Sequence, residues 1–109
     1  MAVRKTAEPK VIGGAEIHSI VSKEELYGQG GMFAHVCLAK GDIVDWHIHN
    51  GEVDYYYILK GTGIYTDADG KEYPVVAGDV CTIVPGDGHA IRNEQDEVLE
   101  FIALVLYCK

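Results

Sequence analysis

Two histidines separated by a single residue are the part of the sequence best suited to chemistry. His47 and His49 flank Ile48 in a segment whose composition is otherwise typical of a β-strand. Successive side chains of a strand point to opposite faces, so both imidazoles would share one face, with Trp46 and Ile48 on the other. Imidazole is the commonest ligand for transition metals, and burying two such rings without compensation is costly. The pair is therefore a candidate metal site. The alternative is two histidines exposed at the surface.

Three further residues have the chemistry to complete such a site. Glu52 and Asp54 follow an Asn-Gly turn and share a face with each other if a strand restarts there. His89 lies far along the chain, in a glycine-rich turn that leads into another predicted strand. Two or three histidines with one carboxylate leave coordination positions open for water or substrate. That arrangement is typical of a catalytic metal site and not of a closed structural one.

Short β-strands are predicted to position these residues. Glycines divide the chain at intervals of roughly 8–12 residues, which favours an all-β sandwich or barrel. The segments with β-branched, aromatic or alternating composition are 32–38, 55–59, 80–84 and 98–107. The last of these has almost no polar alternation, so we expect a central strand that is covered on both faces.

Two local motifs and one terminal segment add to this prediction. Asp67 to Gly70 indicates a hairpin turn, because Asp and Gly tolerate the backbone angles that tight turns require. Ser22 and Glu25 can form a capping box, and the single turn that follows is the one helical candidate. Residues 1–10 are polar, and we expect them to be flexible until something pairs with them.

Composition and charge limit the possible classes of function. The chain has 109 residues, 48% of them hydrophobic, and a net charge of -8, which predicts a single globular domain over 1–109. So acidic a surface repels phosphate backbones, which disfavours nucleic acid as a partner. No apolar run approaches the roughly 20 residues of a membrane span, so we expect no membrane insertion. The start of the chain has no apolar signal segment, and this favours a cytoplasmic protein.

The three cysteines form no CxxC pair, and each directly follows an apolar residue. Cys37, Cys81 and Cys108 are an odd number, so they cannot all form disulfides within one chain. We therefore predict that they are reduced, buried thiols in a reducing compartment.

Taken together, these residues resemble the cupin family, whose sequences carry two spaced motifs. The first motif is matched by Gly41, five residues, His47-Ile48-His49, four residues, Asp54, six residues and Gly61, with Asp54 where the family has Glu. The second is matched by Gly78 through Asn93, except that Val84 stands at the proline position and Pro85 follows it. The motifs cover 41–61 and 78–93, about half of the chain.

The resemblance implies a double-stranded β-helix, or jelly roll, with at most one short helix. It also implies that His47, His49, Asp54 and His89 bind a divalent iron, manganese, nickel or zinc ion inside the barrel. Asp is shorter than Glu by one methylene, so three alternatives stay open at the carboxylate position. The strand shifts to bring Asp54 to the metal, or three histidines bind it with a bridging water, or Glu52 takes the place of Asp54.

Other residues are candidates for the pocket or for surface roles. Residues predicted to line a pocket beside the metal are Glu52, Tyr56, Phe33, Ile83 and Phe101. His18 and His35 lie outside the motifs, and the expected role of His35 is that of a satisfied core or surface residue. Arg92 could neutralise an anionic substrate, although a surface ion pair is the commoner outcome. The acidic residues between 94 and 100 are expected in a solvated loop.

Two classes of function follow from these residues. The first is a metal-dependent enzyme acting on a small carboxylate-like or sugar-like molecule, as an oxygenase, a decarboxylase or an isomerase. The second is a binding or sensing module that holds a small ligand or a metal without turnover. A barrel that has lost its metal site is a third interpretation, and the presence of all three motif histidines argues against it. We also predict a homodimer, because exposed sheet edges need covering and the N-terminal segment has no evident local partner.

Overall fold

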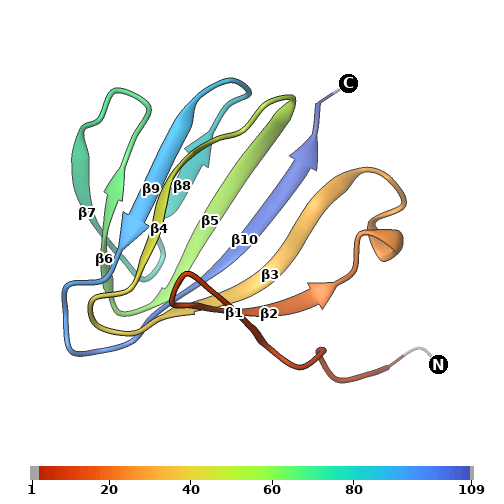
Figure 1. The fold of residues 1–109 in the computed structure, drawn as a ribbon, viewed down its shortest axis with the longest axis horizontal. Helices are drawn as coiled ribbons and strands as arrows, with labels where there is room; N and C mark the ends of the chain where they lie inside the picture. Colours follow the sequence, from red (N-terminus) through yellow and green to blue (C-terminus); the bar gives the residue numbers. More distant parts are fainter. Residues whose placement is uncertain (1–2, 109) are drawn as a thin grey trace.

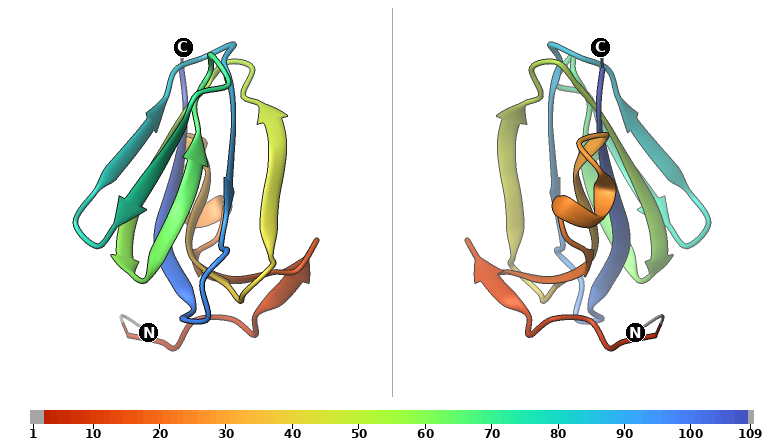
Figure 2. Two further views of the ribbon diagram at one scale, coloured as in Figure 1. Left: turned by 90° about the vertical axis from the view of Figure 1, so that its left-hand side faces the viewer. Right: turned by 90° about the vertical axis from the view of Figure 1, so that its right-hand side faces the viewer.

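The computed structural model describes residues 3–108 and consists of two β-sheets packed face to face (Figures 1 and 2). The strands are β1 (Lys10–Ile12), β2 (Ala15–Val21), β3 (Gly30–Leu38), β4 (Ile43–Ile48), β5 (Glu52–Lys60), β6 (Thr62–Thr66), β7 (Glu72–Val76), β8 (Val80–Ile83), β9 (Gly88–Arg92) and β10 (Leu99–Tyr107). One sheet has the order β1-β2-β3-β10-β5-β8, and the other has the order β4-β9-β6-β7. The predicted all-β jelly roll is confirmed.

The strand predicted to be central occupies that position. β10 pairs antiparallel with β3 on one side and with β5 on the other, which places it in the middle of the six-stranded sheet. Its inner residues Phe101, Ala103 and Val105 are buried, and the residues between them are only half-buried. The strand therefore has one fully covered face, and its outer face is partly open to solvent.

The core fills the space between the two sheets. The largest fully buried side chains are Phe101, Leu38, Ile58, Ile91 and Leu99, and they come from both sheets. Burying each such side chain contributes roughly 1.5–3 kcal/mol. On β5 the alternation is clear, because Tyr56 and Ile58 are buried while Tyr57 is exposed. Asp54 lies two residues before Tyr56 on the same inner face, so a carboxylate enters the core.

The two predicted local motifs are both present. β6 and β7 form an antiparallel hairpin, and the Asp67 carboxylate accepts hydrogen bonds from the backbone N–H groups of Asp69 and Lys71. Gly70 closes that turn with a φ of 81°, which a side chain would disfavour. Ser22 and Glu25 exchange hydrogen bonds at 2.9 and 3.2 Å in front of a short 3-10 turn, Glu24–Leu26, labelled η1.

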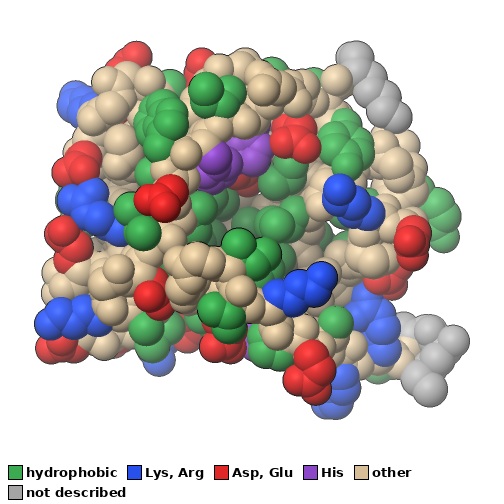
Figure 3. Space-filling model, viewed as in Figure 1, with side chains coloured by type: hydrophobic (Ala, Val, Ile, Leu, Met, Phe, Trp, Pro, Cys, Tyr) green, Lys and Arg blue, Asp and Glu red, His purple; other side chains and the backbone are tan. Residues whose placement is uncertain are grey.

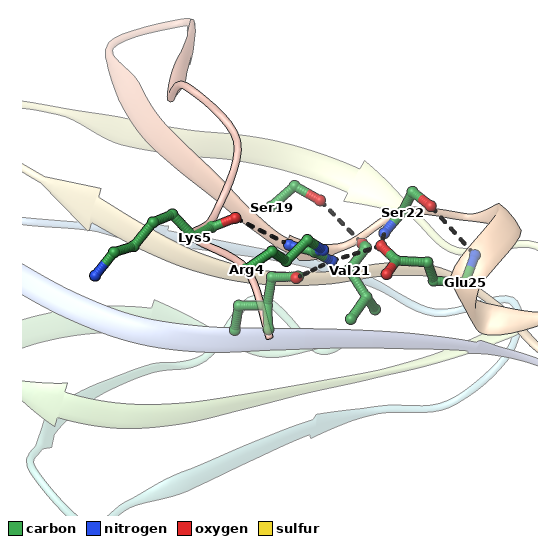
Figure 4. Close-up of polar contacts among 7 residues, drawn as sticks. Arg4, Lys5, Ser19, Val21, Ser22 and Glu25 are labelled. Atoms are coloured by element: carbon green, nitrogen blue, oxygen red, sulfur yellow. Dashed lines mark hydrogen bonds and ion pairs between the residues drawn. The ribbon is translucent and has the colours of Figure 1, made fainter. Parts of the chain in front are cut away.

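The N-terminal segment has local partners, contrary to the prediction. β1 pairs with β2, and the Arg4 guanidinium donates to the Ile20 carbonyl at 2.9 Å and to the Glu25 carboxylate at 2.6 Å (Figure 4). Arg4 contacts a carboxylate more than twenty positions away, a pairing that local composition does not encode. The flexibility of residues 3–10 stays a prediction. Residues 1 and 2 lie outside the described range. Among residues 3–108, no helix has the length and apolar character needed to cross a membrane.

Candidate metal centre

Four of the predicted site residues meet inside the barrel. His47, His49, Asp54 and His89 each offer one ligand atom, and these four atoms lie within 4.8 Å of one another. The Asp54 Oδ2 atom is 3.0 Å from His89 Nε2 and 3.1 Å from His49 Nε2. The Nε2 atoms of His89 and His47 are 3.1 Å apart. Three imidazole nitrogens and one carboxylate oxygen therefore converge on one point.

Strand register explains how distant residues reach this point. β4 pairs with β9 so that His47 stands directly opposite His89. His49 follows the end of β4, and its backbone is held by hydrogen bonds to Asp87 and Gly86 in the turn before β9. Asp54 arrives from the other sheet on β5. The site thus joins the two layers of the sandwich.

A close approach at Gly88 supports the same register. A Cβ atom added at Gly88 would collide with the indole ring of Trp46, whose own side chain is 47% exposed on the outer face of β4. Trp46 and Ile48 point away from the cluster, as the alternation of the His47-Ile48-His49 segment predicts. Glycine at position 88 therefore lets β4 and β9 approach closely enough for His47 and His89 to meet.

The Nδ1 atom of each histidine is engaged by a neighbour, which aims Nε2 into the cluster. His47 Nδ1 donates to the Asp45 carbonyl at 2.8 Å, and His49 Nδ1 lies 2.9 Å from the Glu52 carboxylate. A carbonyl and a carboxylate accept hydrogen bonds, so both Nδ1 atoms carry hydrogen and both Nε2 atoms keep a lone pair. His89 Nδ1 lies 2.8 Å from the Tyr65 hydroxyl. Partners of this kind orient metal-binding histidines in proteins generally.

The buried polar atoms of the cluster fit a cation. Asp54 is only 2% exposed, and its Oδ1 atom and His49 Nε2 have no hydrogen-bond partner. No lysine or arginine among residues 3–108 lies within ion-pair distance of this carboxylate. A buried carboxylate without a positive partner is costly. A divalent ion at the point of convergence would give His49 Nε2 a partner and balance the charge of the Asp54 carboxylate, and the donor set suits a first-row transition metal.

Burial also tunes the titrating groups around the cluster. It lowers the pKa of His47, because the charged imidazolium is poorly solvated there, and the neighbouring His89 and His49 lower it further. A neutral imidazole is the form that binds a metal. Burial, reinforced by the Asp54 carboxylate, raises the pKa of Tyr56 well above its usual value, and burial likewise raises that of Tyr65. Both phenols therefore stay protonated near neutral pH.

A cavity of about 240 Å³ opens beside the cluster. His47, His49 and Asp54 line one part of it, and Tyr56 is a further lining residue. The rest of the lining is apolar and comes from Ile17, Met32, Val36, Val44, Phe101, Ala103 and Val105. Figure 3 shows the hollow, with histidine side chains at its edge and hydrophobic side chains inside it. No lysine or arginine of the described chain lines this cavity.

Three of the five predicted pocket residues are placed differently. Phe33 lies on the outer face of β3, because the buried residues of that strand have even numbers and Met32 and Val36 line the cavity instead. Ile83 is buried opposite Asp54 but does not line the cavity. Glu52 contacts the outer nitrogen of His49 and stays outside the four-residue cluster. Tyr56 and Phe101 line the cavity as predicted.

Several residues that line the cavity or contact the cluster were not predicted from the sequence. Tyr65 was not singled out, although its position two residues after Gly63 on the inner face of β6 is a signal that alternation could have provided. The residues Met32, Val36, Ala103 and Val105 follow from the same alternation once the strands β3 and β10 are placed side by side. The prediction failed on β3 because the odd-numbered and even-numbered residues there are both largely apolar.

The remaining candidates lie away from the cavity. Arg92 forms ion pairs with Glu72 at 2.5 Å and Glu94 at 3.0 Å, so it acts as a surface residue. His35 contacts Glu100 on the outer face of the six-stranded sheet. Glu100 belongs to β10, which corrects the expectation that it lies in a solvated loop, whereas residues 94–97 are exposed.

The cysteines are all free thiols, but only one is buried. Cys81 is buried, Cys37 is half-buried and Cys108 is exposed, which corrects the expectation of three buried thiols. Burial raises the pKa of Cys81 to about 11 and also raises that of Cys37, where the Glu100 and Glu16 carboxylates add to the effect. Neither thiol is poised as a reactive nucleophile.

Comparisons with known proteins agree with this geometry. A cupin domain family matches residues 34–106. The chain is 39% identical over 94 residues to the oxalate-binding protein of Thermotoga maritima, which covers 86% of this chain and 77% of that protein.

Solved structures of cupin proteins have a fold similar to that of this chain. The crystal structure of a predicted oxalate decarboxylase from Thermotoga maritima superposes with a TM-score of 0.88 at 33% identity, covering 95% of this chain and 99% of that one. A sugar phosphate isomerase of the cupin superfamily from Silicibacter pomeroyi reaches a TM-score of 0.74 at 19% identity, covering 94% and 70% of the two chains. The family match over most of the barrel, together with the relative at 39% identity, shows that this chain belongs to the cupin family.

Proposed function

We propose that this cupin is a metal-dependent enzyme for a small carboxylate-like or sugar-like molecule. His47, His49, Asp54 and His89 would hold one divalent iron, manganese, nickel or zinc ion. The observation that carries the proposal is the convergence of three Nε2 atoms on the buried Asp54 carboxylate, with two of the buried polar atoms left without partners. Asp54 is favoured over Glu52 as the carboxylate ligand, because Glu52 already accepts from the far side of the His49 ring.

The cavity beside this cluster supports a ligand held chiefly through its oxygen atoms. In the part of the chain that the structure describes, no lysine or arginine lines it to neutralise an anion, so a carboxylate would depend on the metal for its charge partner. When bound, the ion would act as a Lewis acid toward such an oxygen or as a carrier of dioxygen. The Tyr56 hydroxyl stays protonated and is a hydrogen-bond donor for the substrate. The apolar wall would exclude water from the remainder of the molecule.

The lining also bears on the type of reaction. An isomerase moves a proton and requires a general base, whereas among residues 3–108 no acid or base lines the cavity beyond the cluster residues and Tyr56. This favours an oxygenase over a sugar isomerase. The relative from Thermotoga maritima is named for oxalate binding, so small dicarboxylates are the first compounds to test.

The shortage of acids and bases in the cavity also supports an alternative function, that of a binding module. A cavity without a free general acid or base suits a module that binds a small carboxylate through its metal and does not convert it. The enzyme converts its ligand and the binding module does not. Oxygen consumption and product analysis, measured with a compound that is shown to bind, therefore distinguish the two functions. If a compound binds but no product forms, the result favours the binding module over the enzyme.

We further propose that residues 1–109 act as one domain, that the chain forms a homodimer, and that it works in a reducing compartment such as the cytoplasm. The free state of all three cysteines supports the last point. Support for the dimer comes from β1, an edge strand whose Val11 side chain is exposed.

Elemental analysis of protein purified without a chelating tag tests the metal centre. We expect His89→Ala and Asp54→Ala each to lower the transition-metal content by close to one ion per chain relative to the wild type. Asp96→Ala is the matched control, because Asp96 pairs with Lys40 at the surface. Equal metal content in the wild type and in both site variants would contradict the proposal.

A further inference from the structure

A second cluster of metal-binding side chains lies outside the barrel, on the outer face of the six-stranded sheet. His35, Cys37 and Glu100 each place one ligand atom within 4.8 Å of the others. Cys37 and Glu100 are direct partners in the pairing of β3 with β10, and His35 lies two residues before Cys37 on the same face. The three side chains are half-buried, so they are accessible to an ion from solvent.

The donor atoms already stand close to the spacing of a zinc site. His35 Nε2 lies 2.8 Å from Glu100 Oε1 and 3.8 Å from Cys37 Sγ. A tetrahedral zinc ion with bonds of about 2.0–2.1 Å to N and O and about 2.3 Å to S holds its donors roughly 3.3–3.6 Å apart. Adjustments of about half an ångström would therefore bring these two distances into that range, and the Cys37 and Glu100 donor atoms lie within 4.8 Å of each other.

The surroundings of the cluster favour a cation. Glu16 on β2 is the other strand partner of Cys37, so the thiol lies between two carboxylate-bearing residues. The ion-pair partners of Glu16 and Glu100 within residues 3–108 are the histidines His18 and His35, and no lysine or arginine pairs with either carboxylate. The centroid of the His18 ring is 5.7 Å from that of the His35 ring, so His18 is a further imidazole near the cluster. A divalent ion would supply the positive charge that these groups lack.

We propose that His35, Cys37 and Glu100 form a second divalent-metal site, selective for zinc-like ions, with water or His18 as the fourth ligand. Mixed sulfur, nitrogen and oxygen donors suit Zn²⁺ and Co²⁺ better than Mg²⁺ or Ca²⁺. Binding converts the thiol to a thiolate and releases its proton to solvent. The bound ion would link β3 to β10 on the outer face, independently of the barrel cluster.

Cobalt absorption distinguishes this site from the barrel. A thiolate bound to Co²⁺ gives a charge-transfer band in the near ultraviolet, and none of the four barrel residues is a cysteine. We expect chelator-treated, reduced protein to develop this band on titration with Co²⁺, and Zn²⁺ to abolish it by displacement. The band should persist in His89→Ala, so failure of the barrel site would leave this test unaffected.

Variants locate the site. Cys37→Ser should abolish the band, and His35→Ala and Glu100→Gln should each weaken Co²⁺ binding at least about tenfold. Cys108→Ser is the matched control, because Cys108 is exposed and lies outside the cluster. Circular dichroism verifies that each variant is folded. If Cys37→Ser does not fold, Glu100→Gln takes its place as the variant that tests the site. No band in the wild type, an undiminished band in Cys37→Ser, or an unchanged Co²⁺ affinity in Glu100→Gln would overturn the proposal.

Discussion

At the scale of single residues, the barrel cluster depends on neighbours that do not touch its centre. Tyr65, Asp45 and Glu52 each contact the Nδ1 atom of one histidine. These contacts select the orientation in which Nε2 faces the Asp54 carboxylate. Loss of one such partner commonly lowers metal affinity by roughly 10–100-fold in other proteins.

Tyr65→Phe tests this dependence. The change removes the hydroxyl that lies 2.8 Å from His89 Nδ1 and leaves the ring in place. We expect metal affinity to fall by about tenfold without loss of the fold. Competition with a chromophoric chelator measures the affinity, and Tyr57→Phe, on the outer face of β5, is the control. Equal affinities of Tyr65→Phe and wild type would show that this contact does not support the site.

His47 gives a pH dependence whose direction is fixed by burial. Its pKa is lowered in the folded protein, so the unfolded chain binds more protons between the folded pKa and the ordinary value of about 6.5. The contribution of His47 to stability is complete above that ordinary value and is lost as the pH falls through the folded pKa. Urea unfolding of metal-free protein at several pH values, compared with His47→Ala, measures the effect. An equally steep acid loss in both proteins would assign the pH dependence to other groups.

At the scale of the elements, the approach of β4 to β9 sets the geometry of the site. His47 and His89 are opposite one another in this pair, and Gly88 provides the space that the Trp46 ring occupies. Asn93 reinforces the end of β9, because its buried amide donates to the carbonyls of Leu38 and Glu97. The site therefore depends on backbone contacts of two strands as well as on its ligands.

Gly88→Ala tests this approach. The added methyl group would collide with Trp46, and overpacking of this kind typically costs about 1–3 kcal/mol of unfolding free energy. In a Trp46→Leu background the same change should cost less, because the indole ring is gone. Urea unfolding of the two single variants and the double variant gives the coupling energy. Equal losses in both backgrounds would exclude the Trp46 contact as the cause.

At the scale of the whole molecule, the sandwich encloses one site between its layers and leaves sheet edges exposed. β1 forms one edge of the six-stranded sheet, and Figure 2 shows it extending from the body of the sandwich. Val11 and Ile12 on this strand are 72% and 61% exposed. Exposed apolar edge strands tend to pair with another chain.

Sedimentation tests the resulting expectation of a homodimer. We expect a species of twice the 11.9 kDa chain mass, and Val11→Asp should shift the population toward the monomer because it places a charge on the pairing edge. Lys10→Asp, which also alters charge on β1, is the control for electrostatic effects alone. A single species of 11.9 kDa in the wild type would rule out the dimer.

Features that repeat along one strand or within one turn could be predicted from the amino-acid sequence alone. The alternation of Trp46, His47 and Ile48, the hairpin at Asp67 and the inner face of β5 were all predictable, because side-chain direction in a strand has a period of two. The two spaced motifs also identified the cupin fold, which the family match confirms.

Contacts between strands were decided only by the tertiary structure. Whether Asp54 or Glu52 faces the three histidines depends on the position of β5 in the opposite sheet, and Phe33 was misplaced because both faces of β3 are largely apolar. The contact of Tyr65 with His89 and that of His35 with Glu100 join positions 24 and 65 residues apart. Composition and spacing act locally, whereas these contacts depend on strand register, which is set by packing across the whole barrel.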